Sequence, residues 1–273
     1  MASGSGSGAR LIGVVGARGG IGASSLAAAL ARRLAQGRAG RARRPVRGAR
    51  TSTTVALVDL DGAGGGLDVL LGIEEADGLR WPDLRGARGE VSGAELTSLL
   101  PRWSGVTVLS ADRARPGAPS GEVARAVLDA LRESHDWVVL DLDRHLLLEG
   151  FVAGLGTSGG SSAGLAPGGT PPCAVVLVVA GRELRSVAGL IALRGAVLAA
   201  SGDVRLVVHG PAPGGLGVLE LAHVVDLPVA ASMGRQRGFA AALERGGGPV
   251  PPRGGPFART VDRLVSGLQV TER

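Results

Sequence analysis

The segment LIGVVGARGGIGASS, residues 11–25, decides the fold of this 273-residue chain. Its apolar start, residues 11–15, predicts a buried β-strand, and a glycine cluster follows it. Residues 24–36 then place alanine and leucine at helical spacing. Strand, glycine-rich turn and helix predict the first unit of an α/β fold. The start of the helix offers free N–H groups and a positive dipole end, so the turn suits an anion; a turn without a ligand is the alternative.

Working outward, the same alternation continues along the chain. Further strands are predicted at residues 55–60, 106–110, 137–142, 174–180, 204–209 and 229–232. Helices are predicted at residues 67–71, 93–100, 121–133, 146–155, 183–200, 215–225, 236–244 and 257–268. Pro82 is expected to break any helix within residues 78–84. Apolar strands alternating with helices predict an α/β fold, a doubly wound, mostly parallel sheet with helices on both faces.

Composition sets the domain organisation. Residues 1–9 are mostly Gly and Ser and predict a flexible leader, and residues 10–273 predict a single domain with mobile loops near 37–52 and 156–172. The chain is 45% hydrophobic, which excludes a wholly disordered protein. Its single cysteine, Cys173, excludes a disulfide scaffold and fits a reducing compartment. No apolar run is long enough to span a bilayer, so we expect a cytoplasmic protein.

The net charge of +6 comes from one stretch. Between Arg32 and Arg50 the chain carries only basic charges, whereas acids outnumber arginines elsewhere. Such a stretch indicates either contact with DNA or a membrane surface, or an arginine-biased surface loop. No aromatic side chains interleave for base stacking, which favours the surface loop.

The glycine pattern Gly16-x-x-x-Gly20-x-Gly22 resembles that of short-chain dehydrogenases. Their catalytic pair is a tyrosine and a lysine, and this chain contains no Tyr, Lys or Asn. A working enzyme of that family is therefore excluded, and a non-catalytic dinucleotide site remains open. The four histidines lack ligand spacing for zinc, and Ser24 and Ser25 lack a matching His/Asp set for a hydrolase triad.

Residues 17–24 resemble the deviant Walker A loop of the MinD/ParA family, G-K-G-G-x-G-K-[ST]. Arg18 stands where that family has the signature lysine that reaches across a dimer, and Ala23 replaces the phosphate-binding lysine. The resemblance implies a P-loop NTPase fold and an ATP site. The residues it implies for the nucleotide are Arg18, Gly19, Gly20, Ile21, Gly22, Ala23, Ser24, Ser25 and, after the sixth predicted strand, Pro211.

Two acidic strand ends match the same family in order. VALVDLD, residues 55–61, resembles its D-x-D strand, and WVVLD, residues 137–141, resembles its Walker B strand. The resemblance implies that Ser24, Asp59 and Asp141 hold Mg²⁺, partly through water, and that Asp61 positions the attacking water. Three acids beside a phosphate site also require a cation to offset them. Asp143 stands where a proline is usual in the family.

Longer segments resemble one branch of this family. GGLDVLLG (65–72), GLRWPDL (78–84) and VRLVVHGPAPGGL (204–216) are similar to CpaE/TadZ proteins, and in particular to the actinobacterial septum-site-determining group. The resemblance implies a nucleotide-dependent homodimer that positions a pilus or secretion machine, or the division septum. Its implied location is the cytoplasm, with a peripheral place at the inner membrane, the pole or the septum.

Two questions follow from this resemblance. Without the lysine at position 23, one electrostatic contact with the phosphates is lost, so ATP hydrolysis is expected to be weak or absent. A non-catalytic interaction scaffold with a vestigial nucleotide site is the alternative function. MinD ends in a membrane-binding amphipathic helix, but here the short, weakly charged helix at 257–268 favours packing on the domain.

Overall fold

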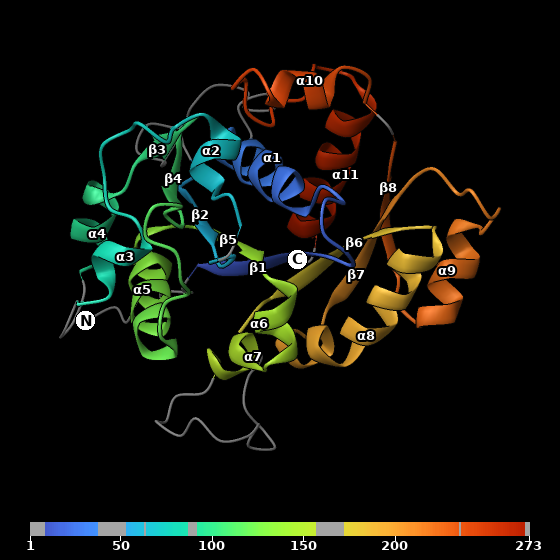
Figure 1. Cartoon of the computed structure of the whole chain (residues 1–273), viewed down its shortest axis with the longest axis horizontal. Helices are drawn as coiled ribbons and strands as arrows, with labels where there is room; N and C mark the ends of the chain where they lie inside the picture. Colours follow the sequence, from blue (N-terminus) through green and yellow to red (C-terminus); the bar gives the residue numbers. More distant parts are fainter. Residues whose placement is uncertain are drawn as a thin grey trace.

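The computed structural model describes residues 9–37, 53–62, 64–86, 92–156, 172–234 and 236–270. These residues form an eight-stranded sheet between two layers of helices (Figure 1). The strands are β1 (Arg10–Gly16), β2 (Val55–Asp59), β3 (Arg102–Trp103), β4 (Val106–Leu109), β5 (Trp137–Leu142), β6 (Val175–Gly181), β7 (Val204–His209) and β8 (Val229–Met233). Their order is β3-β4-β2-β5-β1-β6-β7-β8, and only β3 runs antiparallel to its neighbour.

Each face of the sheet has its own hydrophobic core. One core packs α1 (Ala23–Ala35), α2 (Leu67–Leu71), α10 (Phe239–Leu243) and α11 (Pro256–Val270) on the sheet. The other packs α3 (Trp81–Leu84), α4 (Gly93–Leu99), α5 (Gly121–Ser134), α6 (Arg144–Leu148), α7 (Phe151–Gly154), α8 (Leu184–Ala200) and α9 (Val218–Val225). In β1, Leu11 and Val15 belong to this second core, while Ile12 and Val14 belong to the first. A strand buried on both faces is apolar throughout, which is why its sequence shows no alternation.

The predicted fold class is confirmed, and its topology locates a binding site. From β1 the chain crosses to β2 on one side of the sheet, whereas β6, β7 and β8 extend the other side. The order therefore reverses at β1, and ligands of doubly wound sheets bind beyond the carboxyl ends of the strands at such a reversal. The glycine loop follows β1 at this point.

Three local predictions were wrong. Strand β3 was not predicted, because two residues carry no periodic pattern. Pro82 does not prevent a helix: it lies in the first turn of α3, where a missing N–H costs no helical bond. The single helix predicted at 146–155 is two helices, because Gly150 adopts a φ of 75° between α6 and α7.

The C-terminal helix confirms the packing interpretation. Phe257, Val261, Leu264 and Leu268 of α11 are buried against the core that includes α1. No helix in the described part of the chain is both long and apolar enough to cross a membrane.

The loops expected to be mobile, and most of the arginine-rich stretch, lie at 38–52 and 157–171, outside the described residues. Residues 1–8 of the predicted leader lie outside them as well. Ala9 is buried, and its N–H donates to the Arg132 carbonyl at 3.0 Å.

Candidate functional site

The glycine loop, residues 16–22, joins β1 to α1. Gly20 and Gly22 have φ of 68° and 95°, a left-handed conformation that favours glycine. A side chain added at Gly19 or Gly20 would meet no atom within 4 Å, so the outer face of the loop is open. Gly22 caps α1 without a side-chain bond, and the first turn of α1 contains no acid. The N–H groups of that turn have no helical acceptors, so they are available to an anion.

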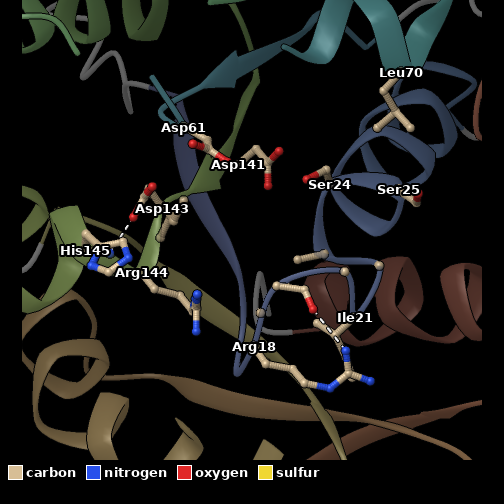
Figure 2. A pocket seen from close by; sticks show the side chains of 16 residues that line it. Arg18, Ile21, Ser24, Ser25, Asp61, Leu70, Asp141, Asp143, Arg144 and His145 are labelled. Carbon is tan, nitrogen blue, oxygen red and sulfur yellow. Dashed lines mark hydrogen bonds between the residues drawn. The ribbon is translucent and has the colours of Figure 1, made fainter. Parts of the chain in front are cut away.

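A first cavity of about 380 Å³ opens beside this loop (Figure 2). Every residue from Arg18 to Ser25 lines it, together with Asp61, Asp141 and the start of α6. The structure thus brings the predicted loop residues and two of the three predicted acids to one cavity. Its volume lies within the usual range for small-molecule sites.

Ser24 and Asp141 connect α1 to the end of β5. Figure 2 shows the Ser24 hydroxyl and the Asp141 carboxyl facing each other across the cavity. Burial raises the pKa of Asp141 to about 8, and the neighbouring charge of Asp59 adds to the rise. The facing Ser24 hydroxyl opposes this rise in pKa. This carboxyl is therefore held in a site that disfavours its charge unless a cation is bound.

Asp59 lies beside Asp141 in the register of β2 with β5, and it is only 2% exposed. Its carboxylate accepts backbone N–H bonds from Leu67 and Asp61, both at 2.9 Å, and from Ala111 at 3.3 Å. Burial raises the pKa of Asp59 to about 6, against the lowering effect of these three N–H groups. Asp59 does not line the first cavity; its oxygens hold the turn that follows β2.

Asp61 lies between the first cavity and a second one. The second cavity, of about 480 Å³, is lined by Asp59, residues 64–67 and the end of α10, and it shares Ser24, Asp61 and Asp141 with the first. Within the described ranges, no three His, Cys, Asp or Glu side chains converge as a metal-binding group. The acids predicted for Mg²⁺ therefore do not form a ready-made cage of direct ligands.

A buried ion pair between Arg80 and Asp68 is connected to Asp59 through Ser110. Arg80 and Asp68 are both buried, with 3.5 Å between Nε and a carboxylate oxygen. The Ser110 hydroxyl lies between the two acids, 3.3 Å from Asp68 and 3.4 Å from Asp59. The indole N–H of Trp81 donates to the Asp59 carbonyl. Asp68 and Trp81, from the segments 65–72 and 78–84, thus help to hold Asp59 in place, a role that the sequence analysis did not assign.

Arg18 is engaged within its own chain. Its Nε donates to Glu183 at 2.5 Å, and its Nη1 donates to the Gly19 carbonyl at 2.9 Å. Burial alone would raise the pKa of Glu183, but the hydrogen bond and charge of Arg18 help to lower it overall. Glu183 was not predicted as a site residue. An acid directly after a strand that neighbours β1 is the sequence signal that indicates it.

The side of the first cavity opposite the glycine loop includes Asp143 and the start of α6. The Asp143 carboxylate caps α6 by accepting the N–H of His145. This is the position at which the resembled family usually has a proline. Arg144 and His145 follow and line the first cavity. The sequence analysis missed both, although a basic pair directly after a predicted Walker B strand is a visible signal.

Pro211 is the one predicted nucleotide residue that the structure keeps apart. It follows a cis Gly210–Pro211 bond after β7 and is exposed. It lines neither of the two cavities, which lie nearer to β1 and β2. The other predicted residues line one or both of them.

The fold is that of ParA and MinD ATPases. A ParA-family ATPase from Chlorobium tepidum has a TM-score of 0.68 at 15% identity, covering 94% of this chain and 98% of that one. MinD from Aquifex aeolicus has a TM-score of 0.65 at 17% identity, covering 96% and 98%. The ATP complex of a McdA variant from Cyanothece has a TM-score of 0.62 at 16% identity, covering 97% and 98%. The chain therefore has a P-loop NTPase fold of the MinD/ParA type.

In sequence, the chain is 35% identical over 237 residues to two uncharacterized proteins from Mycobacterium tuberculosis strains CDC 1551 and H37Rv. These residues are 87% of this chain and 58% of each relative. The chain thus spans less than two thirds of the length of the curated relatives it matches. No protein-family model matches it.

Proposed function

We propose that this chain binds Mg²⁺-ATP in the first cavity and acts as a nucleotide-dependent spatial regulator of the CpaE/TadZ branch of MinD/ParA proteins. The observation that carries the proposal is the cavity itself. There the open amides of the glycine loop line the same cavity as the Ser24 hydroxyl, and this hydroxyl faces a buried strand-end acid, Asp141. A P-loop needs this combination, because amides bind phosphate oxygens while the hydroxyl and the acid serve the metal.

The residues present fit a magnesium nucleotide. Mg²⁺ retains several waters and uses one or two protein oxygens together with phosphate oxygens, so it does not need a cage of carboxylates. Ser24 and Asp141 would hold it, directly or through water, and Asp59 would support them from the neighbouring strand. The raised pKa of Asp141 is the expected property of a carboxyl built for a cation. When bound, Mg²⁺ supplies positive charge to the phosphates.

The role of the chain's own residues then follows. The glycine loop binds and orients the phosphates, and Asp61, at the junction of the two cavities, positions water near them. With a methyl group at Ala23, the loop contributes no lysine to the transferred phosphate. Binding is therefore retained better than hydrolysis, which we propose is weak or absent.

The spatial role is supported by the fold. Solved structures with this fold include a MinD cell division protein, a MinC:MinD complex and plasmid partition proteins. We propose that ATP binding promotes a homodimer that positions a pilus or secretion machine, or the septum, from the cytoplasmic side of the inner membrane. The arginine-rich stretch from Arg32 to Arg50, mostly outside the described residues, is a candidate for weak DNA or membrane contact.

Mg²⁺-ATP is expected to raise the melting temperature of the purified chain and to shift it toward dimer. A ligand at 100 times its Kd adds about 2.7 kcal/mol to the unfolding free energy, because it binds only the folded state. That corresponds to a rise of roughly 5 °C or more for a domain of this size. Differential scanning fluorimetry and light scattering measure the two effects.

Matched variants show whether the response comes from the site. Ser24→Ala removes the cavity hydroxyl and should abolish most of the shift. Ser266→Ala removes an exposed hydroxyl on α11, whose only role shown is a bond to the Asp262 carbonyl, and should respond as the unchanged chain does. In cells, a fluorescent fusion should gather at the pole or the septum and disperse on Ser24→Ala. A chain that neither melts later nor dimerises with millimolar Mg²⁺-ATP would favour the interaction scaffold.

A further inference from the structure

We infer that Arg144 is the phosphate-binding cation of this site and supplies the binding part, though not the catalytic part, of the task of the lysine that the glycine loop lacks. The inference rests on the proposed function, because it needs a phosphorylated ligand in the first cavity. It adds a residue, from a different element, that no pattern in the glycine loop indicates.

The position of Arg144 is fixed by the strand that carries Asp141. β5 pairs with β1, so the residues directly after β5 lie across the cavity from the loop directly after β1. Arg144 is the first residue of α6 and lines this cavity along with residues 18–25. Figure 2 shows its side chain extending from α6 into the space between Asp143 and the glycine loop.

The guanidinium of Arg144 is available for a ligand. Over the residues that the structure describes, it makes no hydrogen bond or ion pair, and it is half-buried. Among the described residues no ion pair joins it to the adjacent acid, Asp143, whose carboxylate accepts the N–H of His145. A half-buried cation without an anionic partner is an arrangement that a bound anion completes.

The charges around the cavity favour a cation in addition to the proposed Mg²⁺. Asp61, Asp141 and Asp143 all line it, and a triphosphate would add further negative charge. Arg18, the arginine within the loop, is paired with Glu183 and therefore brings no net charge to the cavity. Ala23, at the lysine position, offers only a methyl group. Among the described lining residues, Arg144 is the arginine without an acidic partner, and its planar guanidinium matches two phosphate oxygens at once.

The test is a titration of the full chain with a fluorescent Mg²⁺-ATP analogue, read as a Kd and not as turnover. Arg144→Gln is expected to weaken binding by about ten- to a hundredfold, the range for losing hydrogen bonds to a charged group. The loss should be much smaller for Mg²⁺-AMP, which lacks the outer phosphates. Arg263→Gln, an exposed arginine on α11 that lines neither cavity, is the matched control and should bind as the unchanged chain does.

A double-substitution cycle distinguishes replacement of the lysine from a general effect of charge. If both cations serve the same phosphates, Arg144→Gln should cost several-fold less in an Ala23→Lys background than alone. Arg144→Met, which keeps an unbranched apolar stem and loses the charge, must show the same loss if Arg144→Gln melts early without nucleotide. Unchanged affinity in both neutral variants overturns the inference and leaves the proposed function standing. Absence of binding by the unsubstituted chain overturns both.

Discussion

Ala23→Lys is expected to raise the rate of ATP hydrolysis by about a hundredfold or more. A lysine at this position lines the first cavity beside Ser24 and adds an ammonium where negative charge develops on the phosphates. Contacts of this kind contribute on the order of 3 kcal/mol to the transition state. The measurement is steady-state phosphate release at saturating Mg²⁺-ATP, with the Kd determined separately so that binding and turnover are not confused.

The control for Ala23→Lys is a lysine on the same helix away from the cavity. Gln36→Lys adds the same charge at the exposed C-terminal end of α1, where no effect on turnover is expected. Fast hydrolysis by the unsubstituted chain, with no gain from Ala23→Lys, would show that the missing lysine does not limit this site.

The second large effect is on stability without ligand. The folded-state pKa values of about 6 for Asp59 and about 8 for Asp141 lie above the ordinary value of 3.8. Between roughly pH 4 and pH 8 these two acids therefore bind more protons in the folded chain than in the unfolded one, and their contribution to the unfolding free energy falls as pH rises. Asp141→Asn removes the larger contribution, so the metal-free variant should be more stable than the unsubstituted chain at pH 8, by on the order of 2 kcal/mol.

Asp141→Asn should also abolish the Mg²⁺-dependent part of the stabilisation by ATP. The substitution should therefore stabilise the ligand-free protein and weaken its binding of Mg²⁺-ATP. Urea unfolding at a series of pH values, with and without Mg²⁺-ATP, measures both. Asp129→Asn, an exposed acid on α5 whose side chain is 62% accessible, is the matched control. A difference in stability between metal-free Asp141→Asn and the unsubstituted chain that does not grow from pH 5 to pH 8, or loss of stability in metal-free Asp141→Asn at pH 8, would contradict this interpretation of the buried acids.

The fold could be predicted because its central strands are buried on both faces. Residues 11–15 and 137–140 contain no polar side chain for that reason, and such short runs beside a glycine cluster or an acid predict buried strands. β3 and the break at Gly150 could not be predicted. A two-residue strand is specified by its neighbour, and the chain around Gly150 keeps an apolar spacing that also suits one longer helix.

Some residues of the candidate site could be predicted from the sequence, and others could not. Ser24, Asp61 and Asp141 were predicted because they end strands or begin a helix in the order of a known motif. Arg144 and Glu183 were missed because their meaning depends on the sheet order, which places β5 and β6 on either side of β1. The pair of Arg18 with Glu183 joins residues 165 positions apart. The sequence shows that a charged residue follows each of these strands, but not which residue it contacts.

Asp59 shows a different limit. Its position matched a metal-site motif, but both carboxylate oxygens accept backbone N–H bonds that shape the turn after β2. A sequence motif identifies the residue type, but only the structure shows that backbone N–H groups already occupy the carboxylate oxygens of Asp59. In the proposed site its contribution is thus to support Asp141 and position Asp61.

Amide hydrogen exchange along residues 16–25, with and without saturating Mg²⁺-ATP, tests the central claim most directly, because it reads the N–H groups proposed to hold the phosphates. Protection of this segment on adding Mg²⁺-ATP, absent with Mg²⁺ alone and unmatched in the distant helix α4, is the predicted result. Exchange in residues 16–25 that stays the same at every nucleotide concentration would contradict the account.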